Sequence, residues 1–113
     1  MILVAGPYRS GTDGDPVRIE ANVEAMTSVA LELYRRGHLP VLGEWFALPL
    51  IDQAEREGND AAFDQLFHPV AERLLERCDG CLRIGGASDG ADRMVATARR
   101  LGKSVYLDLG EVP

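Results

Sequence analysis

Residues 78–90 read CDGCLRIGGASDG, and this stretch decides the fold. A turn at its start leads into a short apolar strand, which we predict over residues 81–84. Two glycines follow the strand, and Ser88 then stands where the N-cap of a helix is expected. We predict this helix over residues 89–101. A buried strand, a glycine-containing loop and a helix in this order are typical of α/β proteins.

The rest of the chain alternates strand-like and helix-like stretches in the same way. Strands are predicted over 2–5, 38–42 and 104–107, and helices over 16–36 and 48–56. Asp60 is expected to cap a further helix, in which Pro69 should cause a kink or a fresh start. Strands separated by helices imply right-handed crossovers and a parallel sheet. We therefore expect one domain over 1–113, a flavodoxin- or Rossmann-like three-layer sandwich with four parallel strands in the order 2-1-3-4.

Composition and charge exclude some partners. The 113 residues are 46% hydrophobic and 27% charged, as in an ordinary globular protein. The net charge of −6 argues against a nucleic-acid partner, because binding to the phosphate backbone needs a basic face. No apolar run approaches the roughly 20 residues of a membrane helix, and the first residues do not resemble a signal peptide. We expect no membrane partner and a cytoplasmic location.

Cys78 and Cys81 form a C-x-x-C pair. In a cytoplasmic protein they are expected to be reduced, structural thiols, and redox or metal chemistry is the open alternative. His38 and His68 have no metal-ligating partner at a useful spacing, so no metal site is expected. No cofactor is expected either.

Two loops are expected to meet at one edge of the sheet. Gly6-Pro7-Tyr8-Arg9 follows the first strand, and the loop with Gly86, Ser88 and Gly90 follows the third. Ligands of such sheets bind beyond the carboxyl ends of the strands, where the strand order reverses. Arg9 can bind a phosphate or carboxylate in a bidentate manner, and free N–H groups at the helix start favour an anion. The alternatives are a surface arginine and a capped helix without a ligand.

Glu44, Trp45 and Phe46 follow the second strand at the same edge. The two aromatic rings there can sandwich a flat base, and Glu44 can form a hydrogen bond to it. The alternative is that Trp45 and Phe46 make core or subunit contacts.

Three motifs carry a family resemblance: the opening strand running into Gly6-Pro7-Tyr8, the Cys78-Asp79 step before a strand, and Ser88-Asp89-Gly90-Ala91-Asp92. In this order, across nearly the whole chain, they resemble the nucleoside 2-deoxyribosyltransferase superfamily, especially its short, DUF4406-like branch. The resemblance implies a single domain of this type and cleavage or exchange of the N-glycosidic bond of a 2-deoxynucleoside or its monophosphate. It also implies a homodimer or larger homo-oligomer. The ligand would be a nucleoside, a nucleotide or a sugar-phosphate.

The family nucleophile is a glutamate six residues after the serine, and Met94 stands at that position here. A thioether cannot act as that nucleophile, and Met94 fits a core-facing stripe of the last helix. Glu44 and Asp89 are the candidates for a displaced catalytic carboxylate. One alternative is a non-catalytic nucleotide-binding module that has lost the nucleophile. Another is a phosphoribohydrolase of the lysine-decarboxylase-like kind, because Gly85-Gly86 loosely matches its glycine signature.

Overall fold

The computed structural model describes all residues 1–113. It contains a four-stranded sheet in the order β2-β1-β3-β4, and every neighbouring pair of strands is parallel. The predicted α/β class and strand order are therefore confirmed. The elements along the chain are β1 (Ile2–Ala5), α1 (Pro16–Arg35), β2 (Pro40–Val41), α2 (Gly43–Arg56), α3 (Ala62–Glu76), β3 (Gly80–Arg83), α4 (Asp89–Arg100), β4 (Ser104–Tyr106) and the 3₁₀ helix η1 (Leu109–Glu111).

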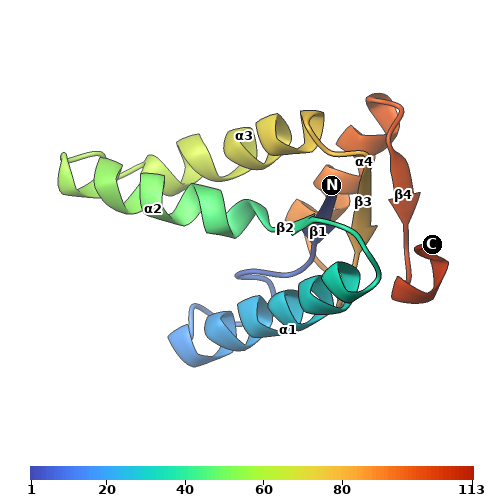
Figure 1. Ribbon diagram of the computed structural model, residues 1–113. Coiled ribbons are helices and arrows are strands. Elements are labelled where there is room, and N and C mark those ends of the chain that lie inside the picture. Colours follow the sequence, from blue (N-terminus) through green and yellow to red (C-terminus); the bar gives the residue numbers. More distant parts are fainter.

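The central strand β1 is buried on both faces of the sheet. Successive side chains of a strand point to opposite faces. Ile2 and Val4 pack in the cluster that contains the buried residues of α1. Leu3 and Ala5 pack on the other side, with the buried residues of α3 and α4. The sheet therefore lies between two helical layers, as in a flavodoxin- or Rossmann-like sandwich, and α1 and α3 lie on opposite sides of the strands (Figure 1).

Helices α2 and α3 form a hairpin that extends beyond the sheet (Figure 1). The two helices share a small apolar cluster of their own, centred on the buried residues Ala47, Ile51 and Ala62. The start of α2 and the second half of α3 lie beside the sheet. The hairpin therefore brings side chains from residues 43–71 to the carboxyl end of β1.

The structure corrects three predicted boundaries. The second strand is only Pro40–Val41 instead of 38–42, because it is an edge strand and Pro40 has no N–H to donate. Helix α2 begins at Gly43 instead of residue 48, although its N-cap, Leu42, makes no side-chain capping bond. Helix α3 continues through Pro69 without a fresh start, and its N-cap is Ala61 instead of Asp60.

Both cysteines are buried and free. Burial raises the pKa of the Cys81 thiol to about 12, which keeps it protonated. No helix of the chain combines the length and the apolar character needed to cross a bilayer.

Candidate functional site

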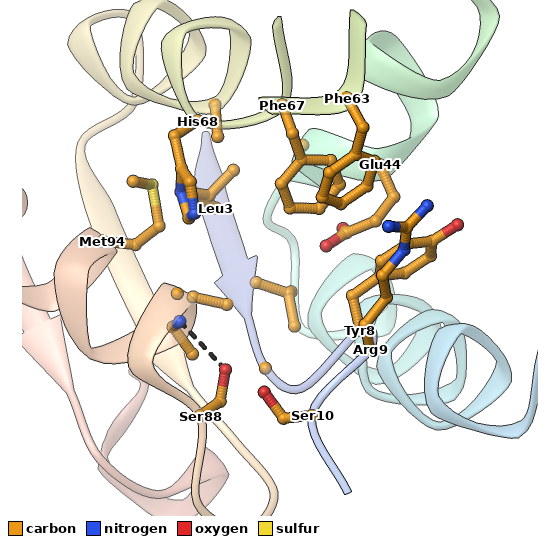
Figure 2. Close-up of a pocket in the computed structure, with 17 residues that line it drawn as sticks. Leu3, Tyr8, Arg9, Ser10, Glu44, Phe63, Phe67, His68, Ser88 and Met94 are labelled. Atoms are coloured by element: carbon orange, nitrogen blue, oxygen red, sulfur yellow. Dashed lines mark hydrogen bonds between the residues drawn. The ribbon is translucent and has the colours of Figure 1, made fainter. Parts of the chain in front are cut away.

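A cavity of about 160 Å³ lies at the carboxyl end of β1 (Figure 2). Its lining comes from two sides. The loop after β1 (residues 6–10) and the first turn of α4 (residues 88–91) form what we call the strand-end wall. The first turn of α2 and one face of α3 form the hairpin wall, with Gly43, Glu44, Phe63, Phe67, His68 and Ala71.

The structure brings most of the residues singled out from the sequence into this cavity. The lining includes Gly6, Tyr8, Arg9, Glu44, Ser88, Gly90 and Met94. The first and third strands are neighbours, so their following loops meet as expected. The part of these residues in binding or catalysis stays a prediction.

Four residues singled out from the sequence do not line the cavity: Pro7, Trp45, Gly86 and Asp89. The ring of Pro7 packs against Gly85, and Gly86 lies in the exposed loop, where its carbonyl accepts a hydrogen bond from Arg83. Asp89 is exposed in the first turn of α4. The structure therefore leaves Glu44 as the one candidate carboxylate at the cavity.

Trp45 and Glu44 are separated because α2 begins earlier than predicted. Adjacent residues of a helix point about 100° apart, so Glu44 faces inward while Trp45 faces outward. The Trp45 side chain is 42% exposed and lies in a shallow apolar depression with Leu31, Tyr34 and Leu39. Of the alternatives for this residue, the subunit contact fits its exposure. The homo-oligomer itself stays a prediction.

The strand-end wall is held by local hydrogen bonds. Ser88 caps α4, and its Oγ accepts a hydrogen bond of 3.1 Å from the Ala91 N–H (Figure 2). The first N–H groups of a helix lack intrahelical acceptors, so those of Asp89 and Gly90 stay open to a ligand. In the loop after β1, the Thr12 hydroxyl donates to the carbonyl of Arg9 at 2.6 Å. The Asn22 amide donates to the carbonyl of Tyr8 at 2.9 Å.

Flat side chains stack across the mouth of the cavity. The ring of Phe67 lies 4.6 Å from that of Phe63 and 5.3 Å from that of Tyr8, with interplanar angles of 18° and 30°. The Arg9 guanidinium lies over the Phe63 ring, 3.7 Å from its centroid, in a cation–π contact. No carboxylate forms a salt bridge with Arg9. Its donors are therefore available to an anion at the cavity.

Glu44 is a buried carboxylate without a hydrogen-bond partner at Oε2. The residue is only 7% exposed, and its side chain lines the cavity. Burial raises the pKa of the Glu44 carboxyl to about 6, although a hydrogen bond from its own backbone N–H opposes the shift. A buried carboxylate with one unpartnered oxygen is a frequent feature of active sites, because its perturbed pKa suits proton transfer or charge stabilisation near neutral pH.

Sequence reasoning missed Phe63, Phe67 and His68 as lining residues. The helical spacing of Phe63 and Phe67 in the sequence is typical of a core-facing stripe, and His68 has no metal-ligating partner. A core stripe and a cavity wall have the same apolar periodicity, so the pattern alone does not separate them. The one available signal was His68, a polar residue close to this apolar face.

Met94 both packs in the core and lines the cavity. It is 5% exposed within the cluster that includes Leu3 and Ala71, and its thioether lies beside His68 in Figure 2. The core-packing interpretation of Met94 is therefore confirmed, and the residue adds only apolar surface to the cavity.

Comparisons of the chain with protein-family models, with curated proteins and with solved structures give no match. The resemblance to the nucleoside 2-deoxyribosyltransferases therefore stays a prediction, and the function is inferred from the cavity. Nowhere in the chain do three or more His, Cys, Asp or Glu side chains form a group that could hold a metal ion.

Proposed function

We propose that this protein binds a nucleoside or nucleoside 5′-monophosphate in the cavity and cleaves its N-glycosidic bond, with Glu44 as the catalytic carboxylate. One observation carries the proposal: Glu44 lines the cavity, is buried, and has no partner at Oε2. A carboxylate is what the chemistry requires, because the departing base leaves an oxocarbenium-like centre at C1′ that an anion stabilises or captures. In this protein the negative charge would come from Glu44 on α2, because the family position on α4 holds the uncharged Met94.

In the proposed reaction, an oxygen of Glu44 forms a bond to C1′. The electron pair of the C1′–N bond goes to the base nitrogen, which takes a proton from solvent. Water then displaces the sugar from Glu44 and gives back the free carboxylate. Because this carboxyl has a pKa of about 6 and must be ionised, the rate should be half-maximal near pH 6 and fall as the pH is lowered.

The remaining parts of the cavity suit the rest of such a ligand. The Arg9 guanidinium and the open N–H groups at the start of α4 can bind a 5′-phosphate. The rings of the hairpin wall offer an apolar surface to a base. Drug-sized ligands usually occupy pockets of roughly 300–1,000 Å³, so a cavity of about 160 Å³ suits a sugar and its phosphate, with the base toward the mouth.

The test is to incubate the protein with each deoxynucleoside and its 5′-monophosphate and to measure free base by chromatography. We expect release by the wild type and a loss of at least about 100-fold in Glu44→Gln. Glu55→Gln, an exposed glutamate of the same helix, is the matched control and should keep full activity. Asp89→Asn tests the second candidate carboxylate and should have little effect.

A non-catalytic binding module is the competing function, and the apolar Met94 at the position of the family nucleophile favours it. It predicts that wild-type protein binds a nucleoside monophosphate but releases no base. That result would remove the enzymatic half of the proposal. In either case Arg9→Ala should weaken binding of the monophosphate by at least about tenfold and leave binding of the nucleoside nearly unchanged.

A further inference from the structure

Two buried side-chain polar atoms in the chain lack a hydrogen-bond partner: Glu44 Oε2 and His68 Nδ1. Both residues line the same cavity. Buried polar atoms without partners are rare in folded proteins, and each one calls for an explanation. Two in one cavity point to a common cause, a ligand that pairs with both.

His68 and Glu44 come from different helices of the hairpin wall. Figure 2 shows His68 descending from α3 beside Leu3 and Met94, while Glu44 extends from α2 on the side of Tyr8 and Arg9. The end of β1 lies between them. A ligand that fills the cavity therefore has the carboxylate on one side and the imidazole on the other.

The imidazole is held in place by its neighbours. Its ring meets the edge of the Phe67 ring, with centroids 5.6 Å apart and planes at 86°. Gly90 also lies close to the ring, since a Cβ at this position would come within 3.0 Å of His68 Cε1. Because Gly90 has no side chain, the imidazole can pack directly against the first turn of α4.

The charges around His68 favour its neutral form. Burial lowers the pKa of His68, the positive charge of Arg93 lowers it further, and Glu72 opposes the shift. Arg93 and Glu72 form a salt bridge of 3.1 Å that joins α4 to α3 next to the ring. A neutral imidazole has a free nitrogen lone pair, so it can accept a proton.

We infer that His68 is the general base that activates water in the second step of the proposed hydrolysis. The inference rests on the proposed function of Glu44. Water forms a bond to C1′ of the sugar held on Glu44, and its proton moves to His68 Nδ1, the ring nitrogen without a partner in the protein. The C1′–O bond to Glu44 breaks, and its electron pair returns to the carboxylate. His68 then releases the proton to solvent.

If His68 is the general base, His68→Gln should slow only the second step of the reaction, the attack of water on the sugar–Glu44 bond. Formation of the sugar–Glu44 bond does not need His68, so the variant should release about one base per protein in a fast burst. Turnover after the burst should be at least about 100-fold slower than in the wild type, because the water is not activated. Mass spectrometry should detect the sugar bound to the protein. His38→Gln, at the only other histidine, is the matched control and should behave as the wild type.

Sodium azide distinguishes a base from a residue that only supports the fold. Azide is an anion and needs no base, so it should speed turnover of His68→Gln and give the sugar azide as product. His68→Asn is a second variant for the same test. Slow turnover without rescue by azide in both variants would overturn the role of His68, as would normal turnover in both. Absence of base release in the wild type would instead overturn the enzymatic half of the proposed function, and this inference with it.

Discussion

The two walls of the cavity are built in different ways. In the strand-end wall, no buried side-chain polar atom lacks a partner: Ser88 caps α4, and the carbonyls of Tyr8 and Arg9 accept hydrogen bonds from Asn22 and Thr12. In the hairpin wall, the Oε2 of Glu44 and the Nδ1 of His68 are buried without partners. The strand-end wall therefore serves the fold as well as any ligand, and the hairpin wall keeps polar groups that the fold alone does not need.

This difference indicates which wall carries the proposed chemistry. A buried polar atom without a partner destabilises the folded protein, and such groups are concentrated at functional sites. Substitutions that remove polar groups from the hairpin wall should therefore stabilise the protein while abolishing the proposed activity. Removal of the Ser88 cap from the strand-end wall should destabilise it.

The largest effect on stability is expected for Gly85→Ala. Gly85 lies next to the strand-end wall and contacts Pro7 in the loop after β1. Gly85 has a φ of +80°, and a Cβ there would come within 2.7 Å of the Pro7 side chain. Strain and overlap together should lower the free energy of unfolding by about 2–3 kcal/mol, measured by urea denaturation. Gly86→Ala is the control, because a Cβ at that position has no neighbour within 4 Å. Equal effects at both positions would contradict the importance of this local geometry.

The next effect is a gain of stability for Glu44→Gln that depends on pH. Folding raises the pKa of this carboxyl from 4.5 to about 6, so ionisation destabilises the folded state as the pH rises through this range. The shift corresponds to about 2 kcal/mol. The free energy of unfolding of the variant relative to the wild type should therefore increase by about 2 kcal/mol between pH 4 and pH 7.5. If the difference in unfolding free energy between variant and wild type did not change with pH, burial would not destabilise the ionised form of Glu44.

The smallest effect is expected for Ser88→Ala. Loss of the hydrogen bond to the Ala91 N–H should lower the free energy of unfolding by about 1 kcal/mol at every pH. Ser10→Ala is the control, since Ser10 lines the same wall and its hydroxyl makes no hydrogen bond within the protein. If Ser88→Ala left the free energy of unfolding unchanged, the hydrogen bonds of the strand-end wall would not stabilise the fold, and the contrast with the hairpin wall would fail.

The strand-end wall was largely predictable from the sequence because its signals are local. Ser88 before a helical stripe indicates an N-cap, and glycines after an apolar run indicate the end of a buried strand. The order of the strands is the one expected of a flavodoxin-like parallel sheet. The structure confirms the order and the cap of α4.

The hairpin wall was less predictable because it depends on contacts between distant segments. Leu42 offers no side-chain cap, so nothing local marks the start of α2 at Gly43. The sequence predicts Glu44 and Trp45 as neighbours in one loop, and only the helix explains why the two face different ways. Phe63 and Phe67 fit a core stripe, and only the packing of α3 over the end of β1 makes them the wall of a cavity.

The outward position of Trp45 has a practical consequence. It is the single tryptophan of the chain, and it occupies the helical turn that carries Glu44. The indole is partly exposed and does not line the cavity. Intrinsic tryptophan fluorescence of the unlabelled protein therefore reports on the first turn of α2, and a nucleobase bound in the cavity does not quench it by direct contact. A spectral shift on titration with a nucleotide would show that this helix moves.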